Sequence, residues 1–208
     1  MILKQLPLDE RWNVYTHAFG ALLSFLGSCW VFYTFDTLDS YAAISMAVYG
    51  FSLVFLFSVS AKYHSVLGEE QVFWQKIDHI GIFFLIAGTY TPVTLTVLIT
   101  SSGLYLFAVV WGIALFGVVY KLFLIGRFKN FSLFLYLAMG WLAVFDFRNI
   151  MELFSSTALA YLMLGGFFYT VGTIFYRWES LYFHHVIWHV FVLCGAAAHF
   201  LMVVHLLV

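Results

Sequence analysis

The sequence predicts an all-α, polytopic membrane protein folded as a bundle of seven transmembrane helices. The chain has 208 residues, of which 64% are hydrophobic and 9% are charged, and a soluble domain does not have this composition. It contains 25 Phe, 13 Tyr and 7 Trp, so it has too much apolar surface to remain disordered in water. Its 9 basic and 10 acidic residues are clustered and leave seven uncharged stretches. Most of these are close to the roughly 20 residues that a helix needs to cross a bilayer.

Each uncharged stretch is expected to form one transmembrane helix. In chain order the stretches are 15–35, 41–61, 80–100, 103–120, 131–145, 157–176 and 181–208. The fifth is short, so we expect it to extend into Phe147 or back toward Phe128. Pro92 lies inside the third, where it removes a helical hydrogen bond and should kink or end the helix. The longest loop is expected over 62–79. No internal repeat or linker interrupts the chain, so residues 1–208 are expected to form one membrane domain.

The distribution of lysine and arginine predicts the orientation of the bundle. Eight of the nine basic residues fall on one side of the predicted spans, and only Arg148 falls on the other. The eight are Lys4, Arg11, Lys62, Lys76, Lys121, Arg127, Lys129 and Arg177. Since basic residues accumulate on the cytoplasmic side, the N-terminus is expected inside and the C-terminus outside. Asp9 and Glu10 precede the first apolar run, and no cleavage-site pattern follows it, so we expect a retained span and no secretory signal.

Two classes of protein are excluded by charge and cysteine content. The net charge is -1, which leaves no basic surface for binding a nucleic acid. Cys29 and Cys194 each lie in a long apolar run, where a thiol behaves as a small buried hydrophobe. We therefore expect neither nucleic-acid binding nor a disulfide framework.

Histidines are the conspicuous polar residues at membrane depth, where ionisable side chains are costly and tend to face the interior of a bundle. Because successive helices alternate in direction, residues far apart in sequence can meet in one layer near the cytoplasmic face. The residues expected in this layer are Glu10, Asn13, His17, Ser60, His64, Asp78, His185 and His189.

The spacing of these histidines predicts a metal site. His185 and His189 are four residues apart and share one helix face, as do Ser60 and His64. The imidazoles of His64, His185 and His189 would leave a tetrahedral Zn²⁺ one open position for water, which is typical of catalytic sites. Asp78 would then either accept a hydrogen bond from that water or orient a ligand. The alternative is that all of these are interfacial groups bonded to carbonyls or lipid headgroups.

Other histidines have less specific expected roles. His199 lies about 40° from His185 around the helix and about 20 Å deeper, so it is expected to line a cavity or bond another helix, not to bind the metal. His184 and His205 are expected at the interface. Glu10, Asn13 and His17 form one stripe at a helix entrance. This stripe is expected either to cap the helix or to form a second shell or substrate gate.

Together these residues resemble the haemolysin III family of bacterial membrane proteins, a branch of the progestin and adipoQ receptor family. The segments that carry the resemblance are Glu10-x-x-Asn13-x-x-x-His17, Ser60-x-x-x-His64, Asp78-His79 followed by Ile86 to Pro92, and His185-x-x-x-His189 with His199 beyond it. The resemblance implies seven helices in the bacterial inner membrane with the N-terminus inside. It also implies a zinc ion held by His64, His185 and His189, with Asp78 on its water and Ser60 nearby.

The resemblance implies membership of a wider group of membrane proteins that look like zinc-dependent hydrolases, with the alkaline ceramidases and the adiponectin receptors among the relatives. Lys62 departs from the expected pattern, because an apolar residue is expected between Ser60 and His64. An ammonium there would either repel the metal or bind an anionic lipid head.

Two functions are consistent with this sequence. In the first, the protein hydrolyses an amide or ester of a membrane lipid: Zn²⁺ activates a water, Asp78 takes its proton, and Ser60 or Lys62 steadies the developing oxyanion or a polar head. In the second, the protein is a non-enzymatic sensor or regulator of lipid state, and a structural zinc joins the helices that carry its histidine ligands. A channel or transporter is disfavoured because paired broken helices are absent from the sequence pattern. Imidazole ligands also suit Fe²⁺ or Mn²⁺, and the substrate and oligomeric state stay open.

Overall fold

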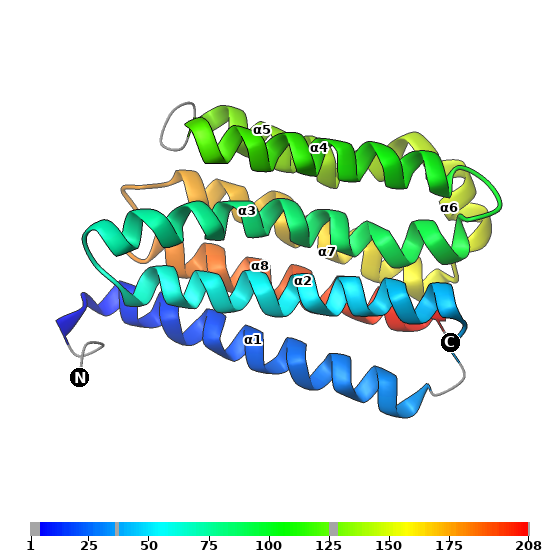
Figure 1. The fold of residues 1–208 in the computed structure, drawn as a ribbon, viewed down its shortest axis with the longest axis horizontal. Helices are drawn as coiled ribbons and strands as arrows, with labels where there is room; N and C mark the ends of the chain where they lie inside the picture. Colours follow the sequence, from blue (N-terminus) through cyan, green and yellow to red (C-terminus); the bar gives the residue numbers. More distant parts are fainter. Residues whose placement is uncertain (1–4, 36–37, 125–128, 208) are drawn as a thin grey trace.

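The computed structural model describes residues 5–35, 38–124 and 129–207, and every regular element in these ranges is a helix (Figure 1). The elements are α1 (Leu8–Thr34), α2 (Ser40–Ser65), α3 (Glu69–Pro92), η2 (Val93–Val97), α4 (Gly103–Leu124), α5 (Lys129–Gly140), η3 (Leu142–Asp146), α6 (Phe147–Leu153), α7 (Ser156–Arg177) and α8 (His184–Leu207). Seven segments are long and apolar enough to cross a membrane. The predicted all-α, seven-span fold is therefore confirmed.

The fifth span is not one continuous helix. It covers Asn130–Leu153 and consists of α5, the short 3₁₀ segment η3 and α6. The span extends beyond the predicted stretch 131–145, past Phe147, as expected for a stretch too short to cross the bilayer. Phe128, the other predicted limit, lies outside the described residues.

Two helices begin at least seven residues earlier than the uncharged stretches predicted. α1 begins at Leu8 instead of residue 15, and α3 begins at Glu69 instead of residue 80. The long loop predicted over 62–79 is therefore wrong, because only residues 66–68 separate α2 from α3. Charged residues were assigned to loops in the prediction, but Glu70 pairs with Lys62 across this turn at 2.8 Å. Paired charges of this kind are compatible with the end of a helix.

Pro92 ends the α-helical part of the third span, as predicted. Its nitrogen has no hydrogen to donate to the preceding turn. The chain continues as the π-helical segment η2, and the N–H of Leu98 bonds to the carbonyl of Val93 at 3.0 Å. The Thr94 hydroxyl donates to the carbonyl of Tyr90 at 2.9 Å. The span therefore changes its helical winding at Pro92 without leaving the membrane-spanning segment.

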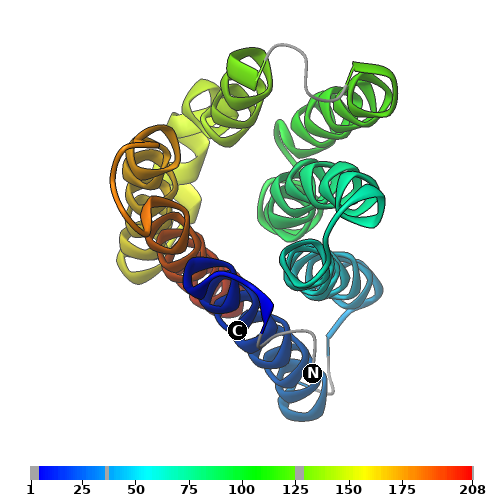
Figure 2. The ribbon, with the colours of Figure 1, turned by 90° about the vertical axis from the view of Figure 1, so that its left-hand side faces the viewer.

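The helices form a ring in the end view (Figure 2). Contacts join α1 to α2, α2 to α3 and α3 to α4, and on the other side α7 to α8 and α8 to α1. α5 contacts α3 and α4. Large apolar side chains such as Tyr33, Phe123 and Phe145 are exposed on the outside, where a bilayer would cover them. The fold is that of a multi-pass integral membrane protein.

The two ends of the chain lie at opposite ends of the bundle, since α1 begins at one end and α8 finishes at the other (Figure 1). This follows from the odd number of spans. Which end faces the cytoplasm stays a prediction from the basic residues, of which Lys4 and Arg127 lie outside the described residues. Cys29 and Cys194 are both free, but Cys29 is exposed and Cys194 is half-buried, so the prediction that both thiols are buried is wrong.

Candidate metal centre

Three histidines converge at the end of the bundle where α2 finishes and α8 begins. One ring nitrogen each from His64, His185 and His189 lies within 4.8 Å of the others. The imidazole centres are 5.0 Å apart for His64 and His185, 4.9 Å for His64 and His189, and 4.7 Å for His185 and His189. This cluster has the composition and spacing of a site that can hold a metal ion. The histidines that the sequence analysis selected as ligands are the ones brought together.

α1 places a carboxylate behind the cluster. The Oε2 of Glu10 lies 2.6 Å from Nδ1 of His64, and the Nδ2 of Asn13 lies 3.4 Å from the same carboxylate oxygen. If Nδ1 of His64 donates to Glu10, the lone pair of the ring is on Nε2. That Nε2 is buried and has no hydrogen-bond partner among the described residues. A buried ring nitrogen without a partner fits a metal ligand, because a metal ion would satisfy it.

His189 is held from the same helix. Its Nδ1 lies 3.3 Å from the Thr16 hydroxyl on α1, and Thr16 also donates to the backbone carbonyl of Trp12 at 2.8 Å. The His17 ring stacks on the His189 ring, with centroids 3.5 Å apart and an angle of 11° between the planes. The stripe of polar residues on α1 therefore packs behind the clustered imidazoles. No side chain caps α1, so the predicted cap is wrong, and a second shell or a substrate gate stays a prediction for this stripe.

Ser60 and Asp78 lie next to the histidines and not among them. Both side chains are buried, and the Ser60 hydroxyl is within hydrogen-bonding reach of the Asp78 carboxylate. Asp78 is inside α3, nine residues after its start, whereas the predicted stretch 80–100 begins two residues after it. It is not one of the three residues whose ligand atoms cluster. Asp78 does lie near enough to His64 for the two side chains to influence each other electrostatically, so the carboxylate is close to the site.

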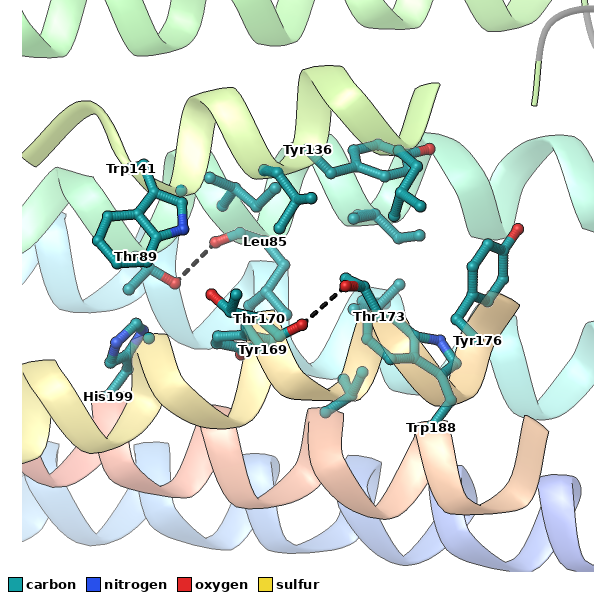
Figure 3. A pocket seen from close by; sticks show the side chains of 18 of the residues that line it. Leu85, Thr89, Tyr136, Trp141, Tyr169, Thr170, Thr173, Tyr176, Trp188 and His199 are labelled. Atoms are coloured by element: carbon teal, nitrogen blue, oxygen red, sulfur yellow. Dashed lines mark hydrogen bonds between the residues drawn. The ribbon is translucent and has the colours of Figure 1, made fainter. Parts of the chain in front are cut away.

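A cavity of about 1080 Å³ extends from this cluster into the bundle. Its lining includes Ser60, Asp78, His185 and His189 at one end and His199 deeper in the membrane. Figure 3 shows side chains from several helices around it, among them Tyr136, Trp141, Tyr169 and Trp188. This volume is about that of a site for a drug-sized or lipid-sized molecule.

His199 lines the cavity and also contacts another helix, so both of the alternatives expected for it are observed. Its Nε2 lies 3.3 Å from the backbone carbonyl of Leu162 on α7. The ring packs where Gly165 has no side chain. His205 is exposed at the far end of α8, as expected, whereas His184 is partly buried with Nδ1 3.2 Å from the carbonyl of Phe175.

The lysine that the sequence analysis singled out is not in the cavity. Lys62 pairs with Glu70 at 2.8 Å, lies 5.8 Å from the Trp74 ring centre, and is absent from the cavity lining. The lysine that does line the cavity is Lys121 on α4. The sequence predicted only that Lys121 lies on the cytoplasmic side, and it predicted no role for Thr16. The one available signal for Thr16 was its position beside His17 on the polar stripe of α1.

Comparison with known proteins gives one consistent match over the chain. Residues 7–200 match the family model described as Haemolysin-III related. The chain is 39% identical to the Hemolysin-3 homolog of Bacillus subtilis (strain 168), covering 94% of this chain and 92% of that protein. It is 35% identical to Hemolysin-3 of Bacillus cereus, covering 97% and 93%. It is also 30% identical to the human Monocyte to macrophage differentiation factor, covering 90% and 80%.

Proposed function

Since the chain belongs to the Haemolysin-III related family and joins a histidine cluster to an internal cavity, we propose that it is a zinc-dependent hydrolase of a membrane lipid. The bond cleaved would be an amide or an ester. The observation that carries the proposal is that His185 and His189 line the same cavity as Ser60 and Asp78. A metal ion at the cluster would therefore act on a molecule bound in that cavity.

The chain supplies three ligands and a partner for one of them. His64, His185 and His189 would bind zinc, and Glu10 would fix the His64 ring so that Nε2 points to the ion. Three neutral imidazoles leave a position open, which is the ligand count of catalytic zinc sites. When bound, zinc would supply Lewis acidity, lowering the pKa of water and polarising a carbonyl oxygen.

Asp78 is the proposed proton acceptor. It would take the proton from the water that attacks the lipid carbonyl and return it to the leaving amine or alkoxide. Ser60 would hold the carboxylate in place through its hydroxyl. Lys62 is not proposed to steady the oxyanion or a polar head, because its ammonium is paired with Glu70 outside the cavity lining.

The remaining parts of the proposal concern location and partner. We propose the bacterial inner membrane as the location, and a membrane lipid as the ligand of the cavity. Support comes from the seven apolar helices and from the apolar and aromatic side chains around the cavity. Membrane fractionation tests the first part. Mass spectrometry of lipid retained by the purified protein tests the second.

The test of catalysis is product release. Zinc-loaded protein in detergent is incubated with ceramides, acyl-amides and phospholipids, beside a known lipid hydrolase in the same detergent. Release of fatty acid from one lipid class, lost on removal of zinc by a chelator and restored by its return, supports the proposal. No release from any lipid, while the known enzyme is active, contradicts it.

A structural role for zinc is the second candidate, and one observation favours it. The three ligands come from α2 and α8, which are far apart in sequence, so a bound ion would join the two sides of the bundle. Metal binding of this kind contributes directly to folded-state stability. In that case the protein would be a non-enzymatic sensor of lipid state.

A further inference from the structure

The cavity has a second polar corner where α3, α4 and α5 meet. Lys121 on α4 lines the cavity, and its side chain is only 4% exposed. Its Nζ lies 3.5 Å from Nδ1 of His79 and 5.9 Å from the centre of the Tyr120 ring. These neighbours are a neutral or cationic imidazole and a neutral ring. Lys121 is therefore a buried ammonium whose close neighbours bring no negative charge.

No described carboxylate forms an ion pair with Lys121. Asp78 interacts with it electrostatically from a longer distance, and its carboxylate is hydrogen-bonded to Ser60. The segment 125–128, which lies outside the described residues, has the sequence Ile-Gly-Arg-Phe and contains no acidic residue. Burying an ammonium is costly unless it is paired. An anion from outside the chain would supply the missing partner.

Ser132 on α5 is the second group at this corner. Ser132 lines the cavity and is 3% exposed, and its hydroxyl is buried without a hydrogen-bond partner in the described part of the chain. A buried hydroxyl without a partner is unusual, because nearly all such groups are satisfied. An oxygen atom of a bound molecule would supply a partner for this hydroxyl.

Contacts around His79 bring Lys121 and Ser132 to the same corner. Tyr136, one helical turn after Ser132 on the same face of α5, donates its hydroxyl to the carbonyl of His79 at 2.9 Å. The residues next to Lys121 and Ser132 also touch, since the Tyr120 and Phe131 rings are 5.3 Å apart. Lys121 thus adjoins His79, Ser132 lies one helical turn before the residue that bonds to His79, and both line the cavity that His185 and His189 also line.

We propose that Lys121 and Ser132 bind the anionic oxygen group, phosphate or carboxylate, of a lipid whose chains occupy the cavity. Lys121 contributes the charge, and Ser132 contributes a hydrogen bond. The anion is carried by a lipid and is not a free ion, because apolar residues such as Leu85, Ile86 and Val192 line the cavity beyond this corner. The proposal rests on the proposed function only in placing a lipid there, and it does not require hydrolysis.

The proposal predicts selectivity between two lipids with the same chains. Binding to the purified full-length protein in detergent is measured with dioleoyl phosphatidic acid, with uncharged dioleoylglycerol and with inorganic phosphate. We expect phosphatidic acid to bind roughly ten- to hundredfold more tightly than dioleoylglycerol, the range for hydrogen bonds to a charged group. Inorganic phosphate is expected not to displace the lipid.

Three variants test whether Lys121 and Ser132 cause the preference for phosphatidic acid over dioleoylglycerol. Lys121→Met should bring the ratio of the two affinities close to one, and Ser132→Ala should reduce it roughly two- to tenfold. Lys62→Met is the matched control, because that lysine lies outside the cavity lining and should leave the ratio unchanged. If Lys121→Met does not fold, Ser132→Ala still tests the site. Zinc content and monodispersity are measured for each variant.

Several outcomes would overturn the proposal. These are an unchanged ratio in both Lys121→Met and Ser132→Ala, equal affinity of the wild type for the two lipids, binding of neither lipid, and displacement of phosphatidic acid by inorganic phosphate. Failure of hydrolysis is separate from these results. A protein that discriminates the lipids through Lys121 but releases no fatty acid retains the anion site and loses only the proposed enzymatic activity.

Discussion

The carboxylate of Glu10 on α1 lies 2.6 Å from Nδ1 of His64 on α2, although the two residues are 54 positions apart in the chain. Carboxylates commonly accept the second ring hydrogen of a metal-binding histidine, fixing its tautomer and orientation. In this protein the contact leaves Nε2 of His64 buried and without a partner at the cluster with His185 and His189. α1 therefore belongs to the candidate site although it contributes none of the three ligands.

Replacing Glu10 should weaken metal binding without abolishing it. In Glu10→Gln the amide is a poorer acceptor, so the His64 ring is less firmly held. We expect zinc affinity to fall roughly 10- to 100-fold, measured by competition with a chromogenic chelator. Asp9→Asn, a change at the neighbouring carboxylate of the same helix, is the control and should leave the affinity unchanged. Equal affinities for Glu10→Gln and the wild type would show that Glu10 does not orient His64.

Removing one imidazole should remove the metal. His64→Ala and His189→Ala are each expected to lower bound zinc from about one ion per chain to near zero, because two remaining ligands hold the ion weakly. The measurement is elemental analysis of purified protein. His205→Ala, at an exposed histidine of α8, should retain the wild-type zinc content. Full zinc occupancy in both ligand variants would place the metal elsewhere.

Substitution of Asp78 distinguishes a zinc-dependent hydrolase from a sensor with structural zinc. Asp78→Asn should keep its zinc, because Asp78 is not among the clustered ligands. If the protein is a hydrolase, its turnover should fall roughly 10²- to 10⁴-fold, the usual contribution of a general base. Glu70→Gln on the same helix is the control and should keep turnover. A lipid hydrolysis rate unchanged in Asp78→Asn would remove Asp78 from the chemistry, and a sensor with structural zinc would tolerate the substitution.

Gly165 and Gly166 give a matched pair for the packing of His199. A Cβ at Gly165 would collide with the His199 imidazole, whereas a Cβ at Gly166 would meet nothing within 4 Å. Gly165→Ala should therefore destabilise the protein by about 1–3 kcal/mol, typical of overpacking, and disturb the bond from His199 to Leu162. Gly166→Ala should be close to neutral. Thermal unfolding of both variants in one detergent is the measurement, and equal melting temperatures would contradict the close contact.

The predicted orientation has its own test. In a variant with Cys29 and Cys194 replaced by serine, a cysteine at Ser101 is expected to react with a membrane-impermeant maleimide in intact spheroplasts. A cysteine at Gly68 should react only after lysis. The physical reason is the excess of basic residues on the side that contains Gly68. The reverse labelling pattern would place the N-terminus outside.

The sequence predicted the ligand set correctly because helical periodicity and alternating span direction are both local properties. His185 and His189 share a face at four-residue spacing, and α2 and α8 have opposite directions, which brings His64 to the same end of the bundle. The limits of the helices were less predictable. Charge was used to mark loops, but Asp78 lies well inside α3, where Ser60 is its hydrogen-bonding neighbour.

By itself, the sequence determined that the chain forms seven membrane-spanning helices, because a bilayer requires about 20 apolar residues for each crossing and the charges leave room for seven. It also determined which face of α8 carries two imidazoles. Only the tertiary structure decided which helix lies behind those imidazoles and which lysine is buried. Lys62 and Lys121 are both lysines near the ends of helices, but one is exposed and paired with Glu70 and the other lines the cavity. Side-chain burial depends on which helices become neighbours, and helical spacing within one segment contains no information about that.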